Sequence, residues 1–332
     1  MSKKKNWIYG RNVVLTGCST GMGKEIALIL AQKYACNIVG IARNEAKLQE
    51  MKRLLGDRFS YRRFDISSQQ AWLEFADEME QIGFHTDLLI NNAGMIQPFL
   101  PYSGLTAQQI QTVLHTNLVS VVSACHAMMP AIKRSPFGGI VNVASASAIL
   151  PVGGESIYSA TKAGVWGLSA CLDQELRGFG KFCSCVMPGP VKTDIYKARE
   201  SEGEVGNKAD NLVQNVGITA KTAAKRIVNK AIRKRKMFVK TDFIAKLMDF
   251  GMRVMPVSTM RITSKLMKSA SGMVSSFYPI YAEQIEQKAQ IRKMLKERKK
   301  SIYKAKTVPA QGFFAEQEHA EEQAKDTQDE QK

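Results

Sequence analysis

The stretch that decides the fold lies near the N-terminus and reads Val13-Val14-Leu15-Thr16-Gly17-Cys18-Ser19-Thr20-Gly21-Met22-Gly23. Its first four residues predict a short buried strand, and apolar residues at helical spacing follow from Ile26. A glycine-rich turn between a strand and a helix lets the backbone approach a pyrophosphate, which the positive potential of the helix N-terminus attracts. The glycines are spaced Gly-x-x-x-Gly-x-Gly, so this turn taken alone could also be a plain strand-to-helix connection.

The end of the second predicted strand, residues 37–42, indicates which dinucleotide fits. In a βαβ dinucleotide fold this strand end faces the adenosine ribose. An acidic residue there binds the 2′-hydroxyl of NAD, whereas an arginine accommodates the 2′-phosphate of NADP. The chain has Ala42 and Arg43, and its next acidic residue is Glu45. NADP is therefore favoured over NAD, with a surface arginine at the start of the next helix as the alternative.

Strands and helices alternate along the following segments. Further strands are predicted at 59–66, 87–90, 140–144 and 182–187, and helices at 45–55, 68–82, 106–133 and 157–179. This alternation predicts an α/β fold with a Rossmann-like, doubly wound parallel sheet. Residues 194–217 are polar and contain glycine, which is typical of a mobile substrate loop.

Two side chains on the last of these helices suggest proton transfer. Tyr158 and Lys162 stand four residues apart, so both lie on one helix face. The lysine charge favours the phenolate and lowers the pKa of the tyrosine from its usual value of about 10. The alternative is a helix that carries an aromatic residue and a solvated lysine by chance. Ser145 follows a strand at the edge where open α/β sheets bind ligands, and Asn117 in mid-helix indicates a specific hydrogen bond or a kink.

Together and in order, these motifs resemble the short-chain dehydrogenase/reductase family over about residues 10–240. The resemblance rests on Thr16–Gly23, Asn91-Asn92-Ala93-Gly94, Asn117, Ser145, Tyr158-x-x-x-Lys162 and Pro188-Gly189. It implies a single Rossmann domain with a seven-stranded parallel sheet. It also implies hydride transfer between a nicotinamide and a carbonyl or alcohol carbon.

The resemblance further implies a role for each matching residue. Tyr158 would donate the proton in reduction, and Lys162 would lower its pKa and hold the nicotinamide ribose. Ser145 would hydrogen-bond the substrate oxygen, and Asn117 would position a water on the proton path. The cofactor-binding residues, besides Tyr158 and Lys162, would be Gly17, Ser19, Gly21, Met22, Gly23, Arg43, Asp65, Ile66, Asn91, Ala93, Pro188, Gly189, Val191 and Thr193.

The positive charge of the chain is concentrated in one C-terminal segment. Residues 1–220 contain 22 Lys or Arg and 18 Asp or Glu. Residues 221–306 contain 23 basic and 5 acidic residues, and residues 307–332 contain 2 basic and 7 acidic residues. We therefore expect a catalytic domain at 1–240, a basic amphipathic helical extension at 241–306 and an acidic disordered tail at 307–332.

The extension combines apolar and basic residues at helical spacing. One helical face is marked by Phe243, Ile244, Leu247, Met248, Gly251, Val254 and Met255. Such a segment suits an anionic membrane surface, a cap over an apolar substrate or a subunit interface. The expected function is NADP-dependent hydride transfer to or from an apolar carbonyl or alcohol, such as a keto-lipid or steroid, in a homo-oligomer.

The alternative function is a membrane- or nucleic-acid-binding protein that uses the basic segment, with the Rossmann domain as scaffold or redox sensor. Few aromatic residues interleave the basic ones, which disfavours single-stranded nucleic acid. The six cysteines lack metal-ligand spacing and suit free thiols in a reducing cytosol, so no metal is expected. The sequence has no apolar run of the roughly 18 residues needed to span a bilayer and no signal-peptide pattern. We therefore expect a cytoplasmic protein, peripheral at a membrane.

Overall fold

The computed structural model describes residues 7–195, 213–271 and 290–300 of the chain. The chain divides into two compact units, residues 1–277 and 278–332. The second unit contributes one described helix, at residues 290–300. The expected acidic tail at 307–332 and most of the expected substrate loop at 194–217 lie outside the described residues.

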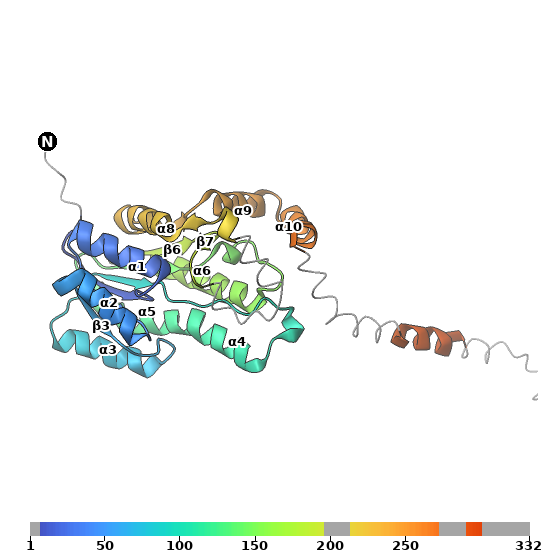
Figure 1. Cartoon of the computed structure of the whole chain (residues 1–332), viewed down its shortest axis with the longest axis horizontal. Coiled ribbons are helices and arrows are strands. Elements are labelled where there is room, and N and C mark those ends of the chain that lie inside the picture. The colour runs from blue at the N-terminus through green and yellow to red at the C-terminus, as the bar shows by residue number, and fades with distance from the viewer. Residues whose placement is uncertain (1–6, 196–212, 272–289, 301–332) are drawn as a thin grey trace, which may run out of the picture. The chain divides into compact units, whose positions relative to one another are not determined.

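A parallel sheet of seven strands forms the centre of the first unit (Figure 1), which confirms the predicted Rossmann-like fold. The strand order is β3-β2-β1-β4-β5-β6-β9, so the winding direction reverses between β1 and β4. The strands are β1 Asn12–Thr16, β2 Asn37–Ile41, β3 Phe59–Arg62, β4 Leu88–Asn91, β5 Gly139–Val143, β6 Phe182–Met187 and β9 Phe238–Lys240. A separate parallel pair joins β7 Val191–Lys192 to β8 Ile218–Thr219.

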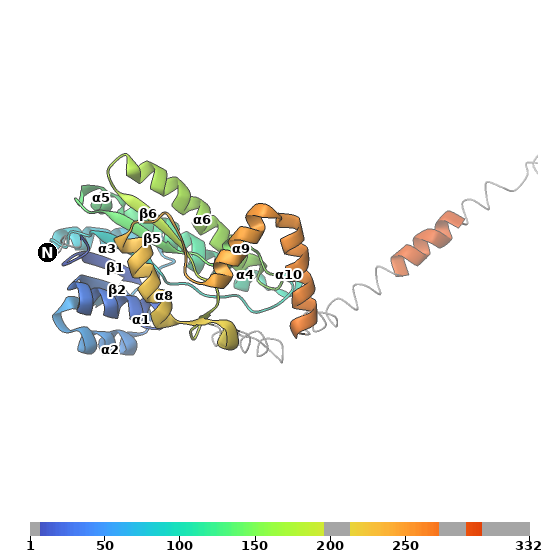
Figure 2. The ribbon, with the colours of Figure 1, turned by 90° about the horizontal axis from the view of Figure 1, so that it is seen from above.

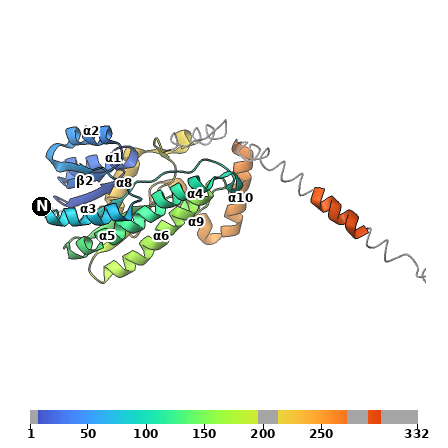
Figure 3. The same cartoon turned by 90° about the horizontal axis from the view of Figure 1, so that it is seen from below.

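Helices cover both faces of this sheet. On one face α1, α2 and α8 pack over one hydrophobic cluster, and on the other face α3, α5 and α6 pack over a second cluster (Figures 1 and 3). The helices are α1 Gly21–Leu28, α2 Glu45–Leu55, α3 Gln69–Gln81, α4 Ala107–Leu114, α5 Ser120–Arg134, α6 Ser156–Arg177, α8 Ala220–Ile227, α9 Phe243–Val254 and α10 Pro256–Ser271. Successive strand residues point to opposite faces, so Val13 and Leu15 enter the first cluster and Val14 enters the second. This two-sided burial explains why the strands are almost continuously apolar.

The helix expected at 106–133 is interrupted in the structure. It forms α4 and α5, separated by a π-helical turn at His115–Val119 that contains Asn117. Periodicity alone predicts one long helix because apolar residues continue through the turn. The turn is the local distortion that Asn117 suggested, and its cause is a set of tertiary hydrogen bonds described below.

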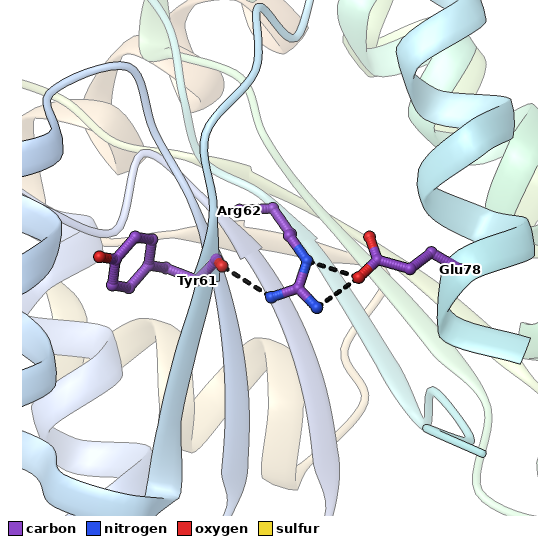
Figure 4. Close-up of polar contacts among 3 residues, drawn as sticks. All are labelled: Tyr61, Arg62 and Glu78. Carbon is purple, nitrogen blue, oxygen red and sulfur yellow. Dashed lines mark hydrogen bonds and ion pairs between the residues drawn. The ribbon is translucent and has the colours of Figure 1, made fainter. Parts of the chain in front are cut away.

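The edge strand β3 is shorter than the expected strand at 59–66 and is fastened to the helices on both sides. Arg62 donates hydrogen bonds to the Glu78 carboxylate on α3 and to the Tyr61 carbonyl (Figure 4). The Tyr61 hydroxyl donates to Glu45 on α2, at 2.7 Å. Because neighbouring strand residues point to opposite faces, these two side chains tie one strand to two helices.

The segment after residue 240 begins inside the main packing. Asp242 is 5% exposed and accepts a hydrogen bond from the Ala245 N–H at the start of α9, and Ala245 is fully buried. Figure 2 shows α9 and α10 meeting at a sharp turn. Helices α9 and α10 thus lie in the first compact unit, whereas the division at residue 240 into a catalytic domain and an extension remains a proposal about function.

Candidate active site

Two glycines of the turn after β1 allow two loops to touch. Gly17 has a φ of +64°, and a Cβ on it would lie 2.8 Å from the Ala93 Cα. A Cβ on Gly23 would lie 2.0 Å from the Gly17 carbonyl oxygen and 2.5 Å from the Asn92 Nδ2. Side chains at either position would therefore separate the loop after β1 from the loop after β4.

Polar side chains fasten these two loops together. The Thr16 hydroxyl accepts hydrogen bonds from the N–H groups of Asn92 and Ala93, both at 3.0 Å. The Asn92 side chain donates to the carbonyls of Thr16 and Gly17, each at 3.2 Å. Asn92 stands inside the Asn91–Gly94 motif but is not among the predicted site residues.

A cavity of about 560 Å³ opens at the carboxyl ends of the strands around β1 and β4. This is the point at which the winding reverses, where open α/β sheets bind ligands. Nine predicted cofactor residues line it: Gly17, Ser19, Gly21, Met22, Arg43, Asp65, Ile66, Ala93 and Thr193. Its size and glycine-lined wall suit a dinucleotide.

One end of the cavity is positively charged. Arg43, Asn44 and Lys47 line this end. Lys47 is not among the predicted cofactor-binding residues, because its position on α2 is typical of a solvent-exposed lysine. Asp65 lines the cavity nearby and accepts hydrogen bonds from the backbone and hydroxyl of Ser67, each at 2.9 Å. The Ser67 backbone bond, with the Ser67 hydroxyl and the Arg43 charge, holds the pKa of Asp65 below its ordinary value.

Asn117 fixes the other end of the cavity. Its fully buried amide accepts a hydrogen bond from the Met95 N–H and donates one to the Met95 carbonyl, both at 2.8 Å. These two bonds hold Asn117 against the loop after β4, which explains why the helix deforms into a π-helical turn there. Gly94 and Met95 both line the cavity, so Asn117 supports its wall from behind.

Lys162 stands next to Asn117 and beneath Tyr158. A Cβ on Gly94 would lie 3.2 Å from the Asn117 Oδ1 and 3.3 Å from the Lys162 Nζ. Lys162 is 4% exposed, donates to the Val143 carbonyl at 3.1 Å, and has its Nζ 5.7 Å from the centre of the Tyr158 ring. Burial lowers its pKa to about 8.

Tyr158 and Ser145 are held by backbone contacts at the ends of their elements. The Tyr158 N–H donates to Gln97 Oε1 at 2.8 Å, while the Gln97 amide donates to the Gly154 carbonyl at 3.1 Å. Ser145 lies two residues beyond β5, with its hydroxyl accepting from the Ser147 N–H at 3.1 Å. Gln97 lies in an irregular segment with no periodicity, so no sequence signal pointed to it.

Five other predicted cofactor residues lie outside the lining of this cavity, as do the predicted catalytic residues Tyr158 and Lys162. Gly23 packs against Gly17, and Val191 is buried in β7. The Asn91 amide is 3% exposed and donates to Asn142 Oδ1 at 2.9 Å, so it points into the interior. Pro188 and Gly189 follow β6, where the Pro188 carbonyl accepts a hydrogen bond from the Ala146 N–H at 2.7 Å.

The loop after β6 is held by Asp242, which is not among the predicted site residues. The Gly189 N–H donates to Asp242 Oδ2 at 2.8 Å, and a Cβ on Gly189 would lie 2.4 Å from the same carboxylate. Thr241 also donates to Asp242, at 2.8 Å. The signal that could have found Asp242 is its place immediately before an apolar helix, where Asp is a preferred N-cap.

Comparisons with known proteins agree with this geometry. A sequence profile of the short chain dehydrogenase family matches residues 11–204. The benzil reductase ((S)-benzoin forming) IRC24 of Saccharomyces cerevisiae is 31% identical over 205 residues, covering 59% of this chain and 78% of the relative. The very-long-chain 3-oxoacyl-CoA reductase of Homo sapiens is 32% identical over 197 residues, covering 58% of this chain and 62% of the relative.

Solved structures share the fold and contain either dinucleotide. A short chain dehydrogenase/reductase from Burkholderia phymatum, solved with NAD, is 25% identical with a TM-score of 0.63, covering 70% of this chain and 89% of that one. A short chain dehydrogenase from Burkholderia cenocepacia, solved with NADP, is 20% identical with a TM-score of 0.65, covering 77% and 98%.

The family profile matches more than half of the 332 residues, and the seven-stranded sheet is the one that the resemblance implied. The chain therefore belongs to the short-chain dehydrogenase/reductase family and is an NAD(P)-dependent oxidoreductase that acts on carbonyl or hydroxyl groups.

Proposed function

We propose that this protein is an NADPH-dependent reductase of an apolar carbonyl compound, such as a keto-lipid or steroid. The observation that carries the proposal is the cavity whose cationic end contains Arg43 and whose other end abuts Asn117 and Lys162. A dinucleotide seated in this cavity would have its 2′-phosphate near Arg43 and its nicotinamide toward Tyr158. When bound, the nicotinamide cofactor supplies the hydride.

The residues of the site then handle the proton. Tyr158 would give its phenolic proton to the carbonyl oxygen, where negative charge develops during reduction. Ser145 donates a hydrogen bond to the same oxygen and stabilises that charge. Lys162 has a pKa of about 8 and is still mostly protonated at neutral pH, so its charge favours the phenolate that remains on Tyr158.

Asn117 acts on the reaction through the backbone. Its side chain is bonded to both backbone polar groups of Met95, so it holds the Gly94–Met95 loop against Lys162. We infer that this support fixes the position of the Gly94–Met95 wall of the cavity relative to Lys162. A water held by Asn117 would complete the proton path to Lys162. Loss of the amide would loosen the wall and the proton path together.

The choice of NADP over NAD rests on charge. Arg43 and Lys47 line one end of the cavity, and a 2′-phosphate would have two cations within that end. Asp65 is the nearby carboxylate, and Ser67 occupies its Oδ1 with two hydrogen bonds. This arrangement favours a phosphate-bearing ribose over a bare 2′-hydroxyl.

The apolar substrate is supported by relatives and by the lining of the cavity. The human relative is named a very-long-chain 3-oxoacyl-CoA reductase. In this chain Met95, Ile96 and Ile195 line the cavity beside Gly94 and provide apolar surface. The chemistry that these residues suit is a carbonyl next to a hydrocarbon chain or ring system.

We also propose that the protein is a cytoplasmic homo-oligomer that meets its substrate at an anionic membrane surface. Exposed Val122 on α5 and Trp166 on α6 provide apolar surface for a second copy. The excess of 23 cations over 5 acids in residues 221–306 supports the membrane contact. None of the described helices is long and apolar enough to cross a membrane.

The test is a panel of carbonyl substrates of rising hydrocarbon length, including steroids, with NADPH consumption as the readout. Turnover should rise with chain length or ring number and should be much slower with NADH. Tight NADPH binding without turnover of any member would instead favour the redox-sensor or scaffold function.

Light scattering after size-exclusion chromatography measures the oligomeric state, and a monomer at the concentration used in the assay would contradict the proposed homo-oligomer.

A further inference from the structure

Helix α9 exposes an apolar stripe made of Phe243, Leu247, Phe250 and Val254, called the α9 stripe below. These side chains are 75%, 57%, 63% and 57% exposed, respectively. They recur at i, i+4, i+7 and i+11, so they lie along one side of the helix. Three of these residues belong to the helical face predicted from the sequence, and Phe250 is the addition.

The helix packs against the protein by its other side. Ala245 is fully buried, and Met248 and Met252 are partly buried. An amphipathic helix normally buries its most apolar face, whereas here the large aromatic and aliphatic side chains face outward. Within the described part of the chain, the α9 stripe is therefore an apolar surface without a covering element.

Cations border the stripe. Residues 243–271 contain five Lys or Arg residues and one acidic residue, Asp249. Lys246 and Arg253 are exposed one turn from the stripe, and on α10 Arg261 is exposed as well. Asp249 is paired with Lys240 at 2.8 Å and with Arg253 at 3.1 Å, so the single acid is already neutralised.

This combination fits one kind of partner. A second copy docking through the same helix would bring two cationic borders together, which is unfavourable. Nucleic acid would contact the cations but would leave the aliphatic side chains without a partner. An anionic lipid surface satisfies both features, because its headgroups attract the cations and its acyl region accepts the apolar side chains.

We propose that the α9 stripe is the face through which this protein docks on anionic lipid, with the active site held at that surface. The inference rests on the membrane contact proposed above and assigns it to one helix. Asp242 provides the link to the site, since the same carboxylate caps α9 and binds the Gly189 N–H of the loop after β6. A helix lying on the lipid thus fixes this loop near the surface, and the loop adjoins Ser145 because the Pro188 carbonyl accepts a hydrogen bond from the Ala146 N–H.

The test is co-sedimentation of the full chain with vesicles of phosphatidylcholine alone or mixed with phosphatidylserine. The variant carries Leu247→Gln, Phe250→Gln and Val254→Gln, which keep helix-forming side chains on the same backbone. The matched control carries Leu54→Gln, Leu73→Gln and Ile82→Gln. These three apolar residues are 49%, 38% and 58% exposed and lie on α2, on α3 and at the C-cap of α3, respectively. Circular dichroism and a thermal unfolding curve like those of the wild type verify that each protein is folded.

The wild type and the control should bind the phosphatidylserine vesicles, and the α9 variant should bind them at least about tenfold more weakly. Equal binding by the α9 variant would overturn the proposal in favour of another segment, such as residues 290–300. Equal binding of the wild type to both vesicle types would refute the anionic preference. If the α9 variant instead loses a dimer and no vesicles bind, the stripe is a subunit interface.

A second variant, Phe250→Trp, places a fluorescent side chain on the α9 stripe, so that insertion of the stripe into the lipid can be measured without weakening the binding. Its added fluorescence should be quenched by vesicles whose acyl chains carry bromine, and absence of quenching would overturn the proposal. Failure of the reductase function would appear separately, as no NADPH consumption by wild type with any substrate while vesicle binding persists.

Discussion

Replacing Lys162 by Met should make the protein more stable at neutral pH while removing its activity. Lys162 is 4% exposed, and burial lowers its pKa from 10.5 to about 8. This difference corresponds to about 3 kcal/mol of cost for burying the charged lysine at neutral pH. Methionine occupies a similar volume without a charge, so Lys162→Met removes that cost.

The gain is reduced by one lost hydrogen bond. The Lys162 ammonium donates to the Val143 carbonyl at 3.1 Å, and leaving that acceptor without the donor costs about 1–2 kcal/mol. The variant should therefore exceed the wild type by about 1–2 kcal/mol in free energy of unfolding at neutral pH. Such a gain at the expense of turnover is the usual relation between stability and a functional site.

The pH dependence gives the sharper check. The folded pKa lies below the unfolded one, so the unfolded chain binds more protons between about pH 8 and pH 10.5, and wild-type stability rises with pH across that window. Below pH 8 the lysine is protonated in both states, and the full cost is present. The advantage of the variant should thus shrink by about 2–3 kcal/mol between about pH 7 and pH 10, which is enough to reverse its sign.

Urea denaturation of the cofactor-free protein, followed by tryptophan fluorescence, measures this difference. The control is Lys221→Met, which removes an exposed lysine from the first turn of α8. Its difference from the wild type should be small at every pH. A Lys162→Met difference that does not change with pH, or a variant less stable than wild type at neutral pH, would refute the reasoning.

Three further predictions concern single side chains of the site. Tyr158→Phe should abolish turnover and leave NADPH affinity nearly unchanged in fluorescence titration, and a residual rate above about a tenth of wild type would remove Tyr158 from the acid role. Arg43→Ala should weaken NADPH binding much more than NADH binding, because only NADPH carries a 2′-phosphate, and equal losses would show a structural role. Asp242→Ala should lower the free energy of unfolding by about 2–4 kcal/mol, because a buried N-cap and the partner of Gly189 are lost. Asp242→Asn should recover most of this, and an Ala variant as stable as wild type in urea would contradict the anchoring role.

The sequence predicts the central strands well because both faces of each strand are buried, which produces continuous apolar runs. The strand β9 at Phe238–Lys240 is different. It has three residues, follows a cluster of cations, and becomes a strand by pairing with β6. Similarly, the break in the helix at 106–133 depends on the bonds between Asn117 and Met95, which join residues 22 positions apart and leave no periodic trace.

The site shows the same division between local and tertiary information. Glycine spacing and the Tyr158–Lys162 pair are local, so sequence motifs identify them. Which of Asn91 and Asn92 faces the cavity is not a local property of the sequence. Neighbouring residues at a strand end point in opposite directions, so only the fold determines which side chain reaches the cavity. Asp242 likewise looks like a capping residue until the fold brings it to Gly189, 53 positions earlier in the chain.

The bond between Asn91 and Asn142 has a consequence for how the sheet assembles. These residues are direct partners in the register of β4 against β5, and Asn142 is fully buried and also donates to Ser169 at 3.0 Å. A slip of one residue between the two strands would leave both amides without partners in an apolar interior, at a cost of about 1–3 kcal/mol for each group. Most other pairs along β4 and β5 are aliphatic and would tolerate a shifted neighbour. The amide pair therefore favours the native register of β4 against β5 and raises the free energy of any pairing of these two strands that is shifted by one residue.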